Sequence, residues 1–149
     1  MKNMILSAVL LFNVATNSTA ANTYPENEKV IKTFNEVFKN ARNVIWSGTA
    51  HFYKASFFVA SVRVSAMLDN KGNLVQTIRY YKEEGLPINT LYATKKDYPH
   101  KDIFGVTEVS NKHGVVYKIV LRDEKSYTYI NANSSGESEV VAKYKRGDK

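Results

Sequence analysis

The chain has 149 residues, a formal charge of +7 and no cysteine. Without cysteine it has no disulfide bond, no thiol nucleophile and no thiolate metal site, so packing must hold the fold together. The basic residues are scattered, and no nucleic-acid-binding motif accompanies them. This argues against a nucleic-acid partner and favours a solvated surface with weak attraction for anions.

The first twenty residues have the features of a cleaved secretory signal. Lys2 gives a short positive region, residues 4–14 form an apolar run too short to cross a bilayer, and small residues end at Ala20. Cleavage near Ala20 would remove Lys2 and lower the formal charge by one to +6. We expect a periplasmic or secreted protein without stable membrane insertion. An N-terminal membrane anchor is the alternative, but polar residues follow the apolar run too soon for it.

Residues 25–41 are predicted to form a helix. Pro25 suits its first turn, and polar residues occupy the positions between the apolar ones. We expect the apolar stripe to pack on the core rather than to bind a partner. Its members recur at the spacing of one helical face: Val30, Phe34, Val37, Phe38 and Ala41.

From residue 43 onward the apolar period changes to two, which predicts short β-strands. A turn at residues 69–72 separates two of them, so we expect an antiparallel sheet with the helix against one face. Trp46 follows the helix closely and is expected to anchor the core behind it. The alternating positions are Val44 and Trp46; Tyr53, Ala55 and Phe57; Val62, Val64, Ala66 and Leu68; and Leu74, Ile78 and Tyr80.

The second half repeats this plan. A helix is predicted at residues 87–97 and ends before Pro99, because proline disfavours helix in the residue before it. Four strands are then predicted, at residues 102–110, 115–122, 126–132 and 139–145. The sequence therefore predicts an α+β fold of tandem helix-plus-antiparallel-sheet units with the helices on one face. The first unit would span residues 21–85 and the second residues 86–149.

The predicted binding residues follow from this alternation. If Leu74, Ile78 and Tyr80 face the helix, Arg79 and Tyr81 lie on the uncovered face. Such a face suits binding, because rigid aromatic side chains bury a large area at small entropic cost and arginine adds directed donors. Packing of these residues against a loop, a dimer partner or one another is an equal alternative. The candidate ligand-binding residues are Phe52, Phe58, Arg79, Tyr81, Lys118 and Arg122.

No catalytic, metal-binding or cofactor-binding residue is predicted. His51, His100 and His113 have no second ligand at metal spacing, and the adjacent Glu83 and Glu84 belong to a polar linker, whereas acid–base catalysis needs a pocket that shifts the pKa values. No phosphate loop, GxSxG elbow or SxxK motif is present either. We therefore do not expect an enzyme.

Several short motifs follow one another from residue 34 to the end of the chain. They are residues 34–38, ARNVIW at 41–46, YKASF at 53–57, AMLD at 66–69 with Gly72, the Tyr-Tyr and Leu-Pro pairs at 80–81 and 86–87, and Tyr98-Pro99. In this order they resemble the exported PepSY-like proteins of Gram-negative bacteria, also described as β-lactamase-inhibitor-like proteins. The resemblance implies tandem helix-plus-sheet units, a periplasmic or secreted location and no known enzymatic activity.

The chain departs from that pattern in two places. Thr90 and Thr94 occur in the second helix where apolar residues are usual, so its core face is expected to depend on Ile88, Leu91 and Tyr98. In addition, no glycine-containing turn precedes the strand around Ala66.

The function expected from these features is that of an exported, non-enzymatic binding module. It would hold a protein or peptide on the open sheet face, for example as an inhibitor or regulator of a secreted enzyme. A self-associating envelope scaffold or stress protein, or a carrier of an anionic glycan or lipid headgroup, is the alternative. The sequence determines neither the target nor the oligomeric state.

Overall fold

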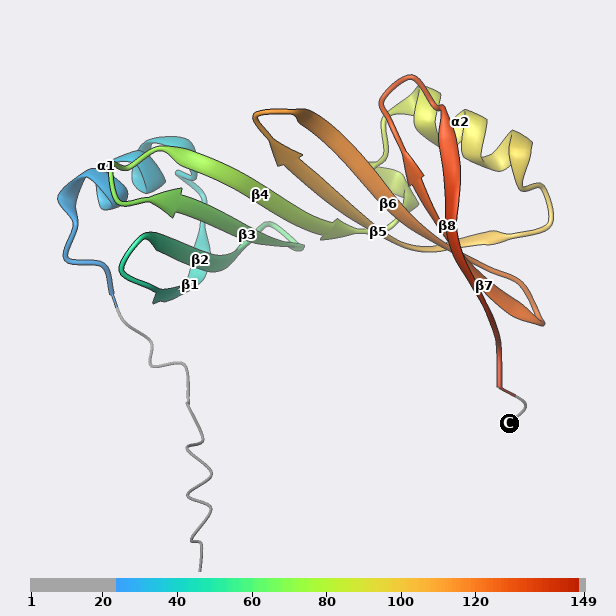
Figure 1. The fold of residues 1–149 in the computed structure, drawn as a ribbon, viewed down its shortest axis with the longest axis horizontal. Helices are drawn as coiled ribbons and strands as arrows, with labels where there is room; N and C mark the ends of the chain where they lie inside the picture. The colour runs from blue at the N-terminus through green and yellow to red at the C-terminus, as the bar shows by residue number, and fades with distance from the viewer. Residues whose placement is uncertain (1–23, 148–149) are drawn as a thin grey trace, which may run out of the picture.

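A computed structural model describes residues 24–147, so the predicted signal segment lies outside the described residues. In chain order a helix and four strands are followed by a short 3-10 helix, a second helix and four more strands (Figure 1). The helices are α1 Glu28–Val37, η1 Glu83–Gly85 and α2 Ile88–Asp97. The strands are β1 Arg42–Gly48, β2 Phe52–Val59, β3 Val62–Asp69, β4 Leu74–Tyr81, β5 Asp102–Asn111, β6 Gly114–Arg122, β7 Ser126–Ala132 and β8 Ser138–Lys145.

The eight strands form one antiparallel sheet in the order β1 to β8. Neighbouring strands are joined by tight hairpins, except that η1 and α2 lie between β4 and β5. The pairing of β4 with β5 makes a single continuous sheet, and the molecule is elongated with α1 near one end and α2 near the other (Figure 1). The predicted α+β class and antiparallel sheet are confirmed.

Helix α1 is shorter than the predicted residues 25–41 because both of its ends are capped inside that range. The Asn27 side chain accepts hydrogen bonds from the backbone N–H groups of Lys29 and Val30, at 3.1 and 3.4 Å. At the other end Phe38 leaves the helical conformation while its N–H donates to the Phe34 carbonyl at 2.8 Å. The helix thus buries Val30 and Phe34.

The first hydrophobic core forms between α1 and strands β1 to β3. The Phe34 ring lies 4.9 Å from that of Trp46 and 5.1 Å from that of Phe57, both in edge-to-face geometry. Trp46 is buried, so the expectation that it anchors this core is confirmed. The buried members are Val30, Phe34, Trp46, Ala55, Phe57, Val64, Ala66 and Leu68.

The second core is less apolar on its helical side. Helix α2 buries Thr90 and Thr94, whereas Ile88 is 74% exposed, so the expectation that Ile88 faces the core is wrong. The Thr90 hydroxyl donates to the Asn133 carbonyl at 2.9 Å, a close approach to the turn before β8 that suits a small side chain. Leu91 and Tyr98 do pack on this core. Its buried members are Leu86, Val106, Tyr117, Ile119, Leu121, Ile130 and Ala132.

The alternation of side chains is broken in β4. Leu68 pairs with Leu74 but Met67 pairs with Gln76, so Val75 is an extra residue. Because side chains alternate between faces, one extra residue moves every later side chain of β4 to the other face. Leu74 therefore lies on the side of the core residue Leu68, and Gln76 on the opposite side.

The turn between β2 and β3 lacks glycine and contains a residue with a strained backbone conformation. Ala60 there has a φ of 50°. This left-handed conformation brings the Cβ atom close to the carbonyl oxygen and costs a non-glycine residue about 1–2 kcal/mol.

The positive φ of Ala60 gives the first prediction. We expect Ala60→Gly to raise the free energy of unfolding by about 0.5–1 kcal/mol, because relief of the strain exceeds the greater freedom of glycine in the unfolded chain. Urea denaturation measures the difference. Ala50→Gly, at an exposed turn residue without a positive φ, is the control and should give no gain; equal changes in the two variants would contradict this account.

Gly72 gives the second prediction. A Cβ atom at this residue, whose φ is +86°, would lie 2.9 Å from backbone atoms of Lys29 in α1. We expect Gly72→Ala to destabilise the protein by about 2–4 kcal/mol, through backbone strain and a clash that displaces the helix. Gly114→Ala separates the two effects, because Gly114 has a φ of +120° but open space around it. Gly114→Ala should lower the free energy of unfolding by only about 1–2 kcal/mol, measured by thermal or urea denaturation.

Candidate binding surface

The strand register shows which side chains share a face of the sheet. Directly paired residues of antiparallel strands point to the same side. Phe58, which alternates with the buried Phe57, pairs with Arg63, and the pairing continues to Tyr80, Thr107 and Lys118. We call the side of the sheet defined by these residues the outer face.

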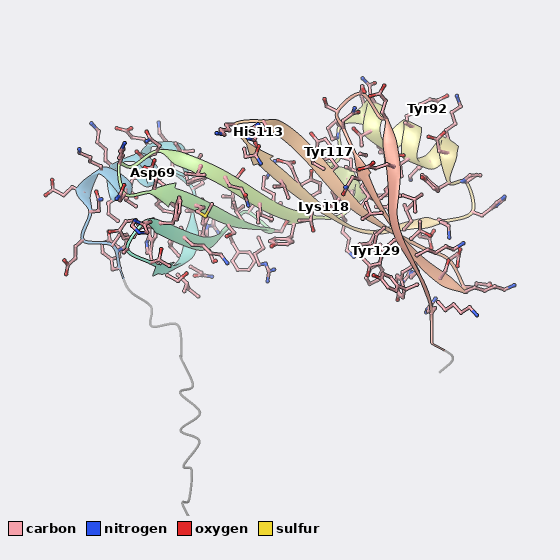
Figure 2. The ribbon with its side chains drawn as sticks, viewed as in Figure 1. Asp69, Tyr92, His113, Tyr117, Lys118 and Tyr129 are labelled. Carbon is pink, nitrogen blue, oxygen red and sulfur yellow. The ribbon has the colours of Figure 1, made fainter. Side chains whose placement is uncertain are left out.

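The outer face contains four of the residues predicted to bind a ligand: Phe52, Phe58, Lys118 and Arg122. Phe52 and Phe58 lie on the same strand and are 43% and 39% exposed. Lys118 is exposed near the middle of the molecule (Figure 2). Arg122 pairs across the sheet with Asp102 and lies toward the far end of β6. The four side chains are thus spread along the sheet rather than gathered in one pocket.

The predicted positions of Arg79 and Tyr81 are wrong. Arg79 pairs with Val64 and Tyr81 pairs with Val106, and both partners are core residues. The reason is the extra residue Val75, since the prediction carried an unbroken two-residue period through β4. Both side chains lie on the side of the cores.

Arg79 and Tyr81 form a polar cluster that ties β4 to β5. The Tyr81 hydroxyl donates to Glu108 Oε2 at 2.5 Å, and Arg79 Nη1 lies 3.4 Å from Glu108 Oε1. Burial, and next the bond to Glu108, raises the pKa of Tyr81, while burial raises the pKa of Tyr117 beside it. Both phenols are therefore neutral at physiological pH, and the bond from Tyr81 to Glu108 fits a structural cluster.

The same change of face in β4 brings two unpredicted residues to the outer face, Ile78 and Tyr80. Ile78 pairs with Val109, and Tyr80 pairs with Thr107. The Arg63 guanidinium lies 4.4 Å from the centre of the Tyr80 ring, which is a close cation–π contact. Ile78 and Tyr80, both half-buried, thus take the places on the outer face that the sequence pattern predicted for Arg79 and Tyr81.

Phe104 is the centre of a second group that sequence analysis missed. It lies at a bulge, between the paired residues Ile103 and Gly105. Arg122 and Lys82 lie 4.9 and 5.1 Å from the centre of its ring, and the Tyr127 ring is at 5.7 Å. As the unpaired residue of the bulge, Phe104 does not follow the regular alternation of side chains between the two faces, and 42% of its surface remains exposed.

Two further tyrosines extend this group toward the sheet edge. The rings of Tyr129 and Tyr144 are 5.5 Å apart in edge-to-face geometry, and Tyr144 is 60% exposed. Figure 2 shows Tyr129 in the second half of the molecule. The outer face of β7 and β8 is therefore an accessible aromatic surface.

A concavity of about 920 Å³ lies where β4 meets β5. Its volume is in the range of small-ligand pockets, but it is open on one side. Residues of both sides of the sheet line it. Tyr80, Thr107 and Val120 of the outer face lie beside Lys82 and Phe104, and the lining also includes Arg79, Tyr81 and Val106 of the core side and the acidic Glu84. Aromatic and aliphatic side chains flanked by a cation can bury an apolar side chain of a partner and hold a carboxylate next to it.

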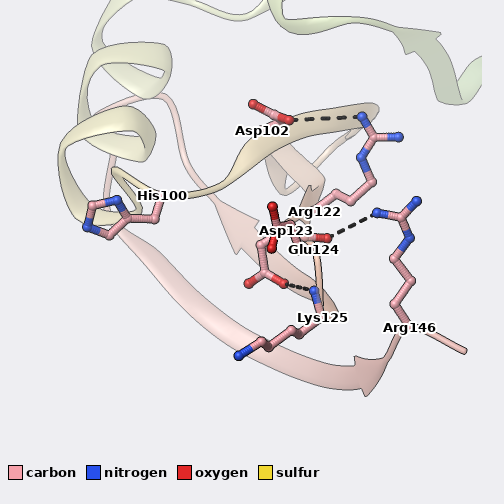
Figure 3. A pocket seen from close by; sticks show the side chains of 7 residues that line it. All are labelled: His100, Asp102, Arg122, Asp123, Glu124, Lys125 and Arg146. Carbon is pink, nitrogen blue, oxygen red and sulfur yellow. Dashed lines mark hydrogen bonds and ion pairs between the residues drawn. The ribbon is translucent and has the colours of Figure 1, made fainter. Parts of the chain in front are cut away.

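A second concavity, of about 540 Å³, is lined mostly by charged residues at the end of the second half (Figure 3). Asp123 organises it by accepting hydrogen bonds from the Lys101 ammonium and from the backbone N–H groups of Lys125 and Ser126. The Lys101 contact, first among several, lowers the pKa of Asp123 below its ordinary value of 3.8. With all these donors engaged, Asp123 is a turn-stabilising residue.

Other kinds of site find little support in the described part of the chain. Residues 24–147 contain no group of three histidine, aspartate or glutamate side chains that could hold a metal ion. Neither helix within that range has the length and apolarity to span a membrane.

Comparison with protein-family models and with curated proteins gives no match for this chain. Solved structures with a similar fold do exist. A BLIP-like protein from Bacteroides fragilis has 15% sequence identity and a TM-score of 0.63, over 85% of this chain and 92% of that one. A DUF2874 family protein from Bacteroides ovatus has 18% identity and a TM-score of 0.63, over 83% and 89%. A "putative periplasmic" protein from Bacteroides eggerthii has 15% identity and a TM-score of 0.60, over 79% and 87%.

At such low identity these similarities concern the fold. They confirm the resemblance to β-lactamase-inhibitor-like proteins that the motif order indicates, and they extend over most of each chain. The targets and activities of those proteins are separate questions.

The third prediction concerns pH. A carboxylate with a lower pKa in the folded than in the unfolded chain contributes stability above its unfolded pKa, and this contribution is lost as the pH falls through the folded value. We expect the urea midpoint to decrease as the pH falls from about 5 to about 2, with Asp123 supplying part of the decrease. Asp123→Asn should be less stable at pH 7 and less sensitive over this interval. An unchanged pH dependence in that variant would refute the assignment.

Proposed function

We propose that this protein is an exported, non-enzymatic binding module that holds a protein or peptide on the outer face of its sheet. The observation that supports this most directly is the set of aromatic side chains left accessible on that face, one of which, Phe104, lies against two cations. Phe58, Phe104 and Tyr144 expose large apolar surfaces there. Accessible apolar patches of this kind are typical of interaction sites.

The proposed architecture has two units, residues 21–85 and 86–149, with both helices on the side of the sheet opposite the outer face. The register supports it, because Val64, Arg79, Glu108 and Tyr117 pair in succession and link the two cores on one side. The helices have the same length and end in the same way, with Phe38 N–H on Phe34 and Tyr98 N–H on Thr94.

The turns repeat as well. Asp69 Oδ1 accepts from the N–H groups two and four residues later, and so does Asn133 Oδ1. In each turn a glycine with positive φ, Gly72 or Gly136, lies against the helix of its own half. These matching details are what an internal duplication would produce.

The neighbouring structures suggest the kind of target. The name BLIP-like, given to the Bacteroides fragilis protein, fits an inhibitor or regulator of a secreted enzyme, and the "putative periplasmic" neighbour fits the compartment expected from the first twenty residues. Both are analogies of fold, so the target has to be identified by experiment.

Self-association is the second candidate function. The edge strand β8 exposes Val140 and Val141 as well as Tyr144, and an unpaired strand edge can pair with a second copy. Sedimentation or size-exclusion measurements over a hundred-fold range of concentration test it, since a monomer throughout would exclude this candidate.

The fourth prediction tests the outer face. Immobilised protein, with residues 1–20 removed, is incubated with periplasmic extract and culture fluid, and captured proteins are quantified by mass spectrometry. We expect Phe104→Ala and Tyr80→Ala to reduce capture of the specific partner by about ten-fold or more, as for central aromatic residues of interfaces. Tyr92→Ala is the matched control, because Tyr92 is 69% exposed on α2.

Unchanged melting temperatures would show that the variants remain folded. If all three variants capture the same proteins in the same amounts, the outer face is not the binding surface.

A further inference from the structure

The outer face has a regular pattern of charge and aromatic rings across its strands. Arg42 of β1, Phe58 of β2, Arg63 of β3 and Tyr80 of β4 pair in succession. They form one row, called here the transverse row, that continues through Thr107 to Lys118 of β6. Since neighbouring strands lie about 4.8 Å apart, cation and ring alternate at that spacing over β1 to β4.

The cations of the transverse row are available to a ligand. In residues 24–147, Arg42, Arg63 and Lys118 have no carboxylate within 4.0 Å. Arg63 lies over the Tyr80 ring, and this contact engages none of its N–H donors in an ion pair. The row thus offers hydrogen-bond donors to a ligand.

The acidic side chains that the register places on this face already have partners within the chain. Asp69 accepts hydrogen bonds from its own turn, and Asn73 above all lowers its pKa. Asp102 lies 3.9 Å from Arg122, and Glu139 accepts from Asn131 at 3.4 Å. The basic residues outnumber them: Arg42, Lys54, Arg63, Lys82, Lys118 and Arg122.

A second arrangement of the same kind borders the concavity between β4 and β5. Lys82 and Arg122 both lie on the Phe104 ring, and the Tyr80 ring lines the concavity from β4. Cations and apolar surface therefore adjoin each other here as they do along the transverse row.

We propose that the outer face recognises an acidic protein segment, in which carboxylates alternate with apolar or aromatic side chains. Its carboxylates would pair with Arg63 and Lys118, and with Arg122 in exchange for the 3.9 Å contact of Arg122 with the exposed Asp102. An apolar side chain would enter the concavity beside Tyr80 and Phe104. This inference rests on the proposed function and adds the chemistry of the partner to it.

The spacing of the cations favours a protein segment over a polyanion. Sulfated glycans and anionic membranes carry dense charge and are best met by adjacent cations, whereas here a ring separates each cation of the transverse row from the next. At the positions of the rings, the anionic groups of such a ligand would meet no cation. An amphipathic acidic segment satisfies both kinds of residue, and its charge would speed association at low ionic strength.

The test uses two synthetic 16-residue peptides of identical apolar content, one with glutamates and one with glutamines at the polar positions. Fluorescence anisotropy at 50 and 300 mM NaCl gives the dissociation constants. We expect the glutamate peptide to bind at least about ten-fold more tightly at 50 mM NaCl and to weaken at 300 mM. Arg63→Gln, Lys118→Gln and Arg122→Gln should each weaken its binding by about three-fold to ten-fold. Lys39→Gln and Lys96→Gln each remove one positive charge, near α1 and on α2 respectively. These control variants should change the dissociation constant of the glutamate peptide by less than two-fold.

Equal binding of the two peptides, equal losses in the control variants, or no binding of the glutamate peptide would overturn the proposal. So would tighter binding of heparin, or of vesicles containing phosphatidylglycerol, through the same three cations. If Phe104→Ala abolishes capture of a partner from extract while the two peptides bind alike, the proposed function survives and only the acidic chemistry is wrong.

Discussion

The extra residue Val75 determines what this protein presents to solvent at the centre of its sheet. It keeps Leu74 beside Leu68 on the core side and turns Ile78 and Tyr80 to the outer face. The same shift places the exposed Arg79 and the half-buried Tyr81 on the core side of the sheet, where with Glu108 they link β4 to β5. A single bulge thus puts a polar cluster on the core side and the half-buried Ile78 and Tyr80 on the outer face, because a one-residue slip changes the face of every later side chain.

Continuity between β4 and β5 determines how far the outer face extends across the molecule. Two separate sheets would offer two small surfaces, whereas the observed pairing lets one row of side chains run from β1 to β6 without interruption. Strand β4 supplies no fully buried residue to either core, although Tyr81 packs on the second one. Its residues are half-buried or exposed throughout, which is why it tolerates Arg79 on one side and Tyr80 on the other.

The two cores use different chemistry within the same backbone plan. Under α1, the rings of Phe34, Trp46 and Phe57 fill the space between helix and sheet. Under α2, Thr90 and Thr94 are the buried side chains, and Gly136 meets Ala93 so tightly that a Cβ atom would lie 2.6 Å from it. The apolar residues Ile88 and Tyr92 point outward. The positions of the apolar residues in the sequence of α2 therefore do not indicate which side of the helix is buried.

The sequence by itself determined the element types, the antiparallel arrangement, the burial of Trp46 and the resemblance to β-lactamase-inhibitor-like proteins. These depend on local periodicity, turn residues and motif order, which are written in short segments of the chain. It placed Phe52, Phe58, Lys118 and Arg122 on the outer face, since their strands alternate regularly. Only the tertiary structure decided the positions of Arg79, Tyr81, Phe104 and Ile88. Bulges arise from pairing with a neighbouring strand, and the buried side of a helix depends on what it packs against, so neither can be read from one segment alone.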